Sequence, residues 1–152
     1  DGYKLDWYIG WFLDINFSRY SKINEYINNS DDYIGSIGNS FYYYNGYLVI
    51  EIYALTSLCD DFENIVISTA NGISDDDREL FELVKKNSLT SLSVRKDSIS
   101  NYVRPIEDNY ITFDYAEVDD IDVIKNFSYD DYKKVINSID FSYYSVFYRK
   151  KK

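Results

Sequence analysis

Residues 41–53 read FYYYNGYLVIEIY, two runs of aromatic and branched side chains that are separated by Asn45 and Gly46. Both central residues of a type I′ turn need a positive φ, which Asn and Gly tolerate, so the stretch predicts a β-hairpin with a two-residue turn. That turn also determines the register of the two strands, because it places Tyr44 opposite Tyr47.

Side chains alternate between the two faces of such a hairpin. One face is predicted to belong to the core: Phe41, Tyr43, Leu48, Ile50 and Ile52. The opposite face is predicted to point outward: Tyr42, Tyr44, Tyr47, Val49, Glu51 and Tyr53.

Helices are predicted at residues 21–28, after Ser74 and within residues 119–138, where Ser128 provides the best cap. Residues 29–38, rich in Asn, Asp and Gly, are predicted to form a loop. Further strands are predicted from aromatic and β-branched content at residues 7–17, 64–70, 89–94, 100–104, 110–118 and 140–148.

This order of elements predicts an α+β domain, with a mainly antiparallel sheet of about six to eight strands and two to four short helices packed on it. The 152 residues fit a single globular domain, residues 1–152, because no linker or repeat divides them. The short basic tail at residues 149–152 is interpreted as a solvated terminus.

Acidic residues outnumber basic ones by 26 to 16, which gives a net charge of −10. Residues 23–84 hold twelve acids and only one base, Arg78. Binding nucleic acid through its phosphates needs clustered Lys and Arg, so we expect no direct nucleic-acid binding and favour a basic protein partner. The alternative is that the negative charge only keeps the protein soluble.

The chain contains no His, which excludes a Ser-His-Asp triad, a Cys-His pair and the His-based zinc motifs of hydrolases. No phosphate-binding glycine motif is present. Cys59 is the only cysteine and is followed by two acids, so we expect an inert thiol. The sequence therefore predicts a protein that is not an enzyme and that needs no cofactor.

A lone cysteine permits no internal disulfide, and neither a signal peptide nor an apolar stretch of about 18 residues is visible. We expect a cytoplasmic protein that does not bind membranes. Because the sequence contains no Met, we also expect a short piece to have preceded Asp1.

Carboxylate chemistry survives this elimination, because a glycosidase needs only two carboxyl groups and a hard cation binds carboxylates. The best cluster for a cation is Asp119, Asp120 and Asp122. The same pattern is typical of the first turn of a helix, and its spacing matches no metal loop, so no metal site is predicted. A carboxylate-dependent hydrolase is an unfavoured alternative.

Tyrosine buries much area at little entropic cost, so an outward row of tyrosines favours a protein interface. The alternative is that Tyr, present 18 times, simply suits strands and is common in AT-rich genes. The acids near Ser74 can likewise be read as ordinary helix-start residues. The residues predicted to bind a partner are Tyr42, Tyr44, Tyr47, Glu51, Tyr53, Asp60, Asp61, Asp75, Asp76 and Asp77.

These properties suggest a non-catalytic inhibitor, of the type of an immunity protein that neutralises a basic toxin or nuclease. The alternative is a phage or viral counter-defence protein, such as an anti-CRISPR, anti-restriction or immune-evasion protein. Such a protein could imitate DNA with its carboxylates. One sequence does not reveal the two rows of acids that imitation of DNA requires.

Overall fold

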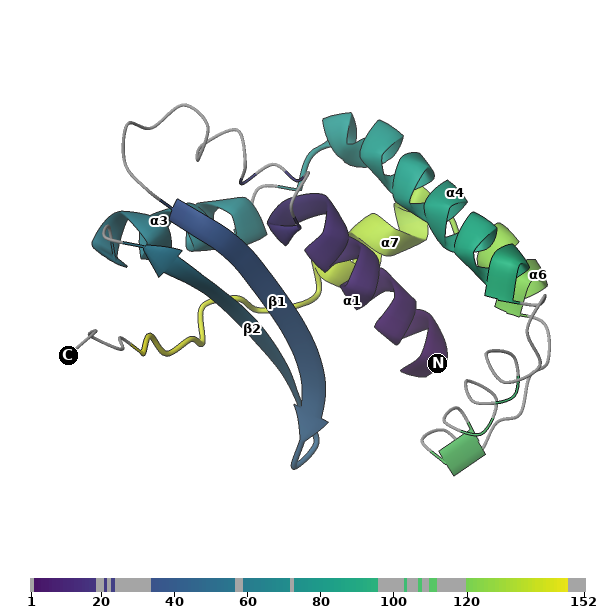
Figure 1. Cartoon of the computed structure of the whole chain (residues 1–152), viewed down its shortest axis with the longest axis horizontal. Helices are drawn as coiled ribbons and strands as arrows, with labels where there is room; N and C mark the ends of the chain where they lie inside the picture. The colour runs from purple at the N-terminus through teal and green to yellow at the C-terminus, as the bar shows by residue number, and fades with distance from the viewer. Residues whose placement is uncertain are drawn as a thin grey trace.

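The structure, a computed structural model, describes residues 2–18, 21, 23, 34–56, 59–71, 73–95, 103, 107, 110–111 and 120–147. A long β-hairpin lies on one side of helix α1, and two of the other helices, α4 and α7, pack against α1 elsewhere (Figure 1). The elements in chain order are α1 (Gly2–Phe17), β1 (Ile34–Tyr44), β2 (Tyr47–Thr56), α3 (Cys59–Asn71), the 3-10 helix η1 (Asp75–Asp77), α4 (Arg78–Arg95), α6 (Asp120–Lys125) and α7 (Tyr129–Ile136).

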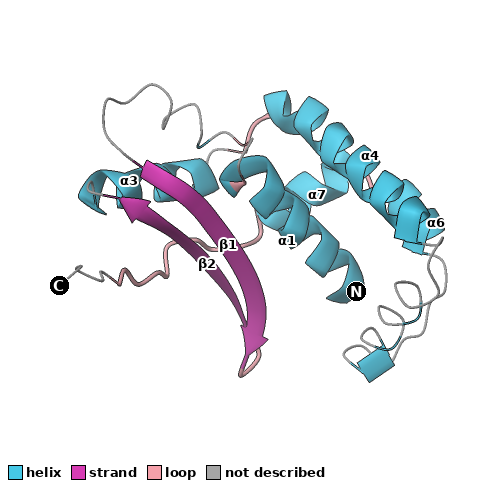
Figure 2. Cartoon of the chain, in the orientation of Figure 1, coloured by secondary structure: helices cyan, strands magenta, loops and turns pink. Residues whose placement is uncertain are grey.

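The protein is α+β, but the predicted sheet of six to eight strands is wrong. Within the described ranges the sheet has only two strands, β1 and β2, and five α-helices supply most of the fold (Figure 2). The predicted strands at residues 7–17, 64–70 and 89–94 lie in α1, α3 and α4. Short apolar runs fit a buried helix as well as a strand, and the aromatic and β-branched content of these runs favoured the wrong choice.

Other predicted boundaries also change. Residues 140–147 form no strand, although the sequence predicts one at 140–148. β1 begins at Ile34, inside the predicted loop at 29–38. Three predicted elements lie mostly outside the described residues: the strands at 100–104 and 110–118 and the helix at 21–28. Within 100–104, the structure describes residue 103 alone.

Helix α1 forms because the rest of the protein covers it on nearly every side. The consecutive residues Trp11, Phe12 and Leu13 are each at most 2% exposed. Successive helical side chains point about 100° apart, so a helix that is buried all round must contact neighbours in every direction. The β propensity scale spans only about 1 kcal/mol, whereas burying one large apolar side chain is worth about 1.5–3 kcal/mol. Burial therefore decides the conformation of this segment.

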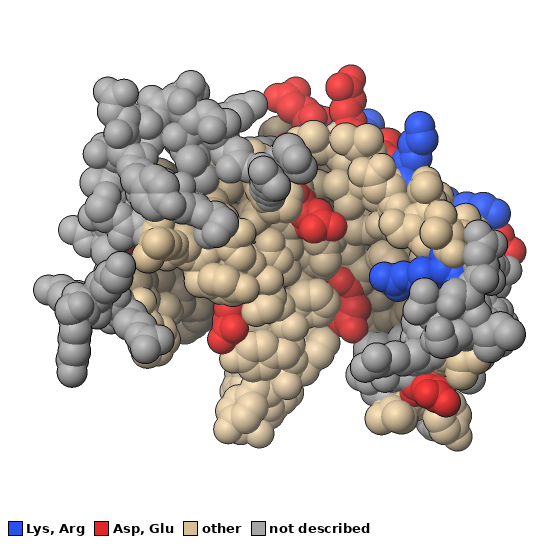
Figure 3. Space-filling view, viewed as in Figure 1, with Lys and Arg blue, Asp and Glu red and all other residues tan. Residues whose placement is uncertain are grey.

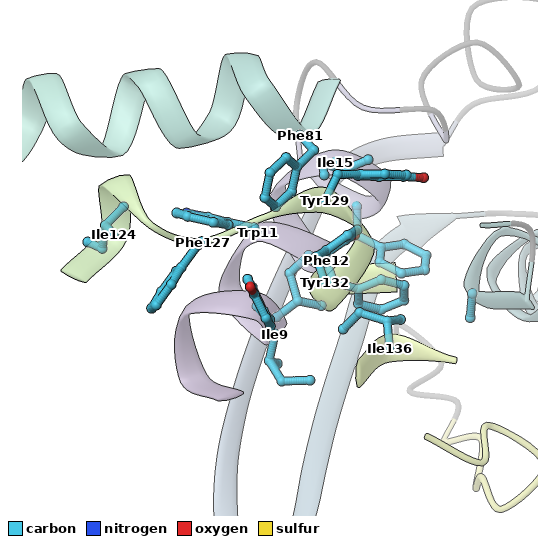
Figure 4. Packing of buried hydrophobic residues seen from close by; sticks show 14 of the residues in the cluster. Ile9, Trp11, Phe12, Ile15, Phe81, Ile124, Phe127, Tyr129, Tyr132 and Ile136 are labelled. Atoms are coloured by element: carbon cyan, nitrogen blue, oxygen red, sulfur yellow. The ribbon is translucent and has the colours of Figure 1, made fainter. Parts of the chain in front are cut away.

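The core is an aromatic cluster around α1 (Figure 4). The ring centroid of Trp11 lies 5.3 Å from that of Phe81 in α4 and 5.9 Å from that of Phe127. The ring of Tyr8 lies 5.7 Å from that of Tyr132 in α7. Most of these pairs meet edge to face, the geometry that the aromatic quadrupole favours. One cluster thus joins α1, α4 and α7.

The two helix starts predicted from Ser74 and Ser128 are confirmed. The backbone N–H of Ser74 donates to Asp77 Oδ2 at 3.1 Å, half of a capping box before α4. The hydroxyl of Ser128 accepts from the backbone N–H of Asp131 at 3.2 Å at the start of α7. Helix α4 runs on to Arg95 and so absorbs the predicted strand at 89–94.

The predicted hairpin is confirmed in turn and register. Asn45 and Gly46 have φ values of 51° and 81°, as a type I′ turn needs, and Tyr44 pairs with Tyr47. The face predicted to be inward packs against the core through its apolar side chains, but the prediction is wrong for Tyr43, which is 45% exposed because it lies near the turn, beyond the reach of the core. The apolar side chains of that face are Phe41, Leu48, Ile50 and Ile52.

The face assignment can be tested by two substitutions. Ile50→Asp should destabilise the protein strongly, because it places an unpaired charge against the core. Tyr44→Ser, on the exposed face, should change the free energy of unfolding by no more than about 0.5 kcal/mol. Urea unfolding of both variants measures the difference, and a larger loss from Tyr44→Ser than from Ile50→Asp would contradict it.

Candidate functional site

The outward side of the hairpin forms what we call the tyrosine face: Tyr42, Tyr44, Tyr47, Glu51 and Tyr53. The exposed fraction of its tyrosines runs from 44% for Tyr42 to 75% for Tyr47. Leu55 follows with the same alternation and is 71% exposed. Large apolar side chains that lie together in solvent are typical of an interaction site.

This face carries almost no charge. Glu51 is the only charged residue of the hairpin, which projects as a nearly uncharged lobe (Figure 3). Its carboxylate accepts hydrogen bonds from Ser40 Oγ at 3.2 Å and from the Tyr42 hydroxyl at 3.1 Å. The bond to Glu51 raises the pKa of Tyr42, so its phenol stays protonated and available as a donor. The acid therefore orders its neighbours as well as carrying charge.

Gly38 positions one tyrosine of the face. It lies opposite Tyr53 across the two strands, and a Cβ added to Gly38 would overlap the Tyr53 ring. The ring therefore lies over the glycine backbone, an arrangement by which an aromatic residue covers a gap in a strand. Gly38 lies in β1, although the sequence predicts a loop at residues 29–38, and its contact with Tyr53 was therefore not expected. The available signal was its position seven residues before Asn45, which the predicted register places opposite Tyr53.

The hairpin is tied to α1 by side-chain hydrogen bonds. The hydroxyl of Tyr43 donates to Asp6 Oδ1 at 2.7 Å, and Asn39 Nδ2 donates to the carbonyl of Phe17 at 3.1 Å. Burial raises the pKa of Asp6, while burial and the bond to Asp6 raise the pKa of Tyr43. Both ends of α1 thus anchor β1, which gives the tyrosine face a supported base.

The five predicted binding acids lie in two separate places. Asp60 and Asp61 begin α3, next to the open end of the hairpin, and Asp61 is exposed. Asp75, Asp76 and Asp77 form η1, beyond the other end of α3, which is about 18 Å long. Asp77 is buried in the cap of α4. The side chain of Asp60 lies outside the described part.

Near η1, acids pair with bases from distant segments. Asp75 Oδ1 lies 2.7 Å from Lys133 Nζ in α7. Asp130 Oδ1 lies 2.8 Å from a guanidinium nitrogen of Arg78, and Asp131 Oδ2 lies 2.8 Å from Lys4 Nζ in α1. Acidic and basic side chains both appear along the upper right margin of the view in Figure 3. Much of the charge here therefore joins α1, α4 and α7 to one another.

The other candidate residues do not form a site. Asp122 pairs with Lys125 Nζ at 2.8 Å, while Asp119 and the side chains of Asp120 and Cys59 are not among those described. Within the described ranges, no three Asp, Glu or Cys side chains gather as metal ligands would. No helix in that part of the chain has the length and apolar character needed to cross a bilayer.

Comparison with known proteins identifies no relative of this chain. No family model, curated protein or solved structure matches this chain.

The ion pairs near η1 should make stability depend on pH. Hydrogen bonding to Lys133 lowers the pKa of Asp75, and hydrogen bonding to Lys4 lowers that of Asp131. A carboxyl group whose pKa is lowered by folding stabilises the folded protein at pH values above its pKa in the unfolded chain, about 3.9. This stability is lost as the pH falls through the pKa of the group in the folded protein. Asp75→Asn with Asp131→Asn should therefore lower the melting temperature at neutral pH, with the difference from wild type closing below about pH 4.

Asp76→Asn is the matched control, because Asp76 is exposed and has no ion pair within the described ranges. This variant should leave the melting temperature nearly unchanged both at neutral pH and below about pH 4. A difference between wild type and the double variant that persists at low pH would contradict the assignment.

Proposed function

We propose that this protein acts by binding another protein and that the tyrosine face is the central contact surface. The observation that carries the proposal is an exposed row of tyrosines on a hairpin with a single charged residue. The cores of protein interfaces are depleted in charge and enriched in Tyr, which supplies contact area and a polar handle together. The bonds from α1 to the hairpin support this face, so little ordering cost is expected on binding.

The proposed partner is a basic protein, and the proposed role is that of a cytoplasmic, non-catalytic inhibitor of the immunity type, acting against a toxin or nuclease. A net charge of −10 favours encounter with a positively charged active site. Asp61, near the open end of the hairpin, and Asp76 are exposed and suited to steering. The uncharged tyrosines would then form the buried contact.

A counter-defence protein that imitates DNA is the weaker candidate. Imitation of DNA needs rows of acids free to present their charge. Asp75, Asp130 and Asp131 are instead engaged by Lys133, Arg78 and Lys4. This arrangement favours binding through tyrosines, with charge acting at a distance.

Binding kinetics can separate the two groups of residues. Tyr44→Ala and Tyr47→Ala should accelerate dissociation, by about tenfold or more where the side chain is a hot spot. Asp61→Asn with Asp76→Asn should mainly slow association and reduce its dependence on salt. The measurement is capture of the partner from the source cell, followed by surface-binding kinetics at two salt concentrations.

Tyr143→Ala is the control, since Tyr143 is highly exposed but lies outside the hairpin. It should bind as wild type does. Unchanged dissociation of both hairpin variants, or recovery of acidic partners only, would overturn the proposal.

A further inference from the structure

A groove of about 390 Å³ runs between α1 and α4, away from the tyrosine face. The two helices lie side by side and antiparallel (Figure 1), and Trp11 Nε1 donates to Ser88 Oγ at 2.9 Å where they meet. The groove is lined by apolar side chains with short polar ones between them. Its main apolar residues are Trp7, Ile15, Leu80, Leu83, Val84 and Leu92.

This lining is only partly covered by the monomer. Leu83 is 53% exposed, and Leu80 and Val84 are half-buried. The residues that α4 contributes recur at spacings of three and four, so they form one stripe along most of the helix. A helix face with an apolar stripe normally packs against another element.

Among the described residues that line the groove, two are charged, and they lie toward opposite ends. Trp11 of α1 meets Ser88 of the antiparallel α4, so Asp14, three residues further along α1, is expected near the level of Val84, whereas Arg95 lies at the end of α4. A rise of 1.5 Å per residue separates the two levels by about 16 Å. Neither side chain has an ion-pair partner in the described ranges. Asp14 is exposed to solvent, although desolvation by its surroundings in the groove raises the pKa of its carboxyl group.

We propose that this groove is the contact face of a homodimer, in which the α1–α4 pair of one copy packs against the same pair of a second copy. The two-fold axis would run across the helices, which places Asp14 against Arg95 of the partner subunit at both ends of the contact. A two-fold axis along the groove would instead bring like charges together. The charge pattern therefore favours a second copy of this chain in the groove, and it also sets the direction in which the helices of that copy run.

A second copy suits this face in other respects. An isologous contact pairs a surface with itself, so on a protein of net charge −10 it needs a region where acids and bases balance. The groove, with one acid and one base, meets that condition. Four antiparallel helices, two from each copy, would form a bundle of ordinary geometry.

The size of the contact predicts a weak dimer. Helix α1 has 16 residues and is about 24 Å long, and two packed helices are about 20 Å wide. If this face is treated as flat, each copy offers a contact area of roughly 500 Å². Both copies together reach about 1,000 Å², the lower limit for a specific interface. We therefore expect an equilibrium between monomer and dimer at micromolar or higher concentrations.

Sedimentation equilibrium of the purified chain, from about 1 µM to about 1 mM, tests the proposal. Wild type should pass from the monomer mass toward twice that mass. Asp14→Arg and Arg95→Asp should each raise the dimer dissociation constant by at least about tenfold, because each brings like charges together at both ends. The double variant with both substitutions should recover to within about threefold of wild type, since it restores opposite pairs.

Leu83→Glu should also abolish the dimer, whereas Tyr44→Ala, on the tyrosine face, should dimerise as wild type does. Thermal melts confirm that each variant is folded, which is expected because the three changed side chains are exposed. Monomers at every concentration would overturn the proposal. So would a double variant as weak as the single ones, or a dimer lost by Tyr44→Ala and kept by Leu83→Glu. These outcomes do not depend on the proposed inhibitor function.

Discussion

The burial of most of α1 is the constraint on which the rest of the fold depends. A helix that is apolar around most of its circumference is stable in water only if several elements cover it at once. The hairpin, α4 and α7 each supply part of this enclosure, and none of them contacts all the others extensively. Loss of any one would expose α1, so we expect the packing around Trp11 to couple the stability of the two-stranded sheet to that of the helices.

The sequence predicts those features that short-range chemistry determines. The Asn45-Gly46 turn implies the register of the hairpin, and Ser74 and Ser128 mark helix starts through their own hydroxyl and backbone groups. The tyrosine face follows from the same register. Local signals could not reveal that α1 is a helix, because its conformation is decided by side chains that lie up to about 120 residues away. The pairing of Asp75 with Lys133 was hidden for the same reason.

Charge and apolar contact surface are largely separated in this molecule. The hairpin is nearly uncharged, the described lining of the α1–α4 groove is balanced, and most exposed acids of the described part lie on η1 and the helices. Long-range fields act over about 8–10 Å at ordinary salt and need no direct contact, whereas desolvating a charge at a contact is costly. Separation of this kind lets the same protein attract a partner electrostatically and still bury an apolar surface against it.

The position of α1 also has a consequence for synthesis of the protein. The hydroxyl of Tyr8 donates to the carbonyl of Ser128, a contact that spans 120 residues. At about 5–20 residues per second, a ribosome takes roughly 6–24 s to make the intervening chain. Through that interval the most apolar helix lacks α7, which is the last of its covering segments to be made. The nascent chain must therefore either be sheltered by a chaperone or delay its final collapse until α7 emerges.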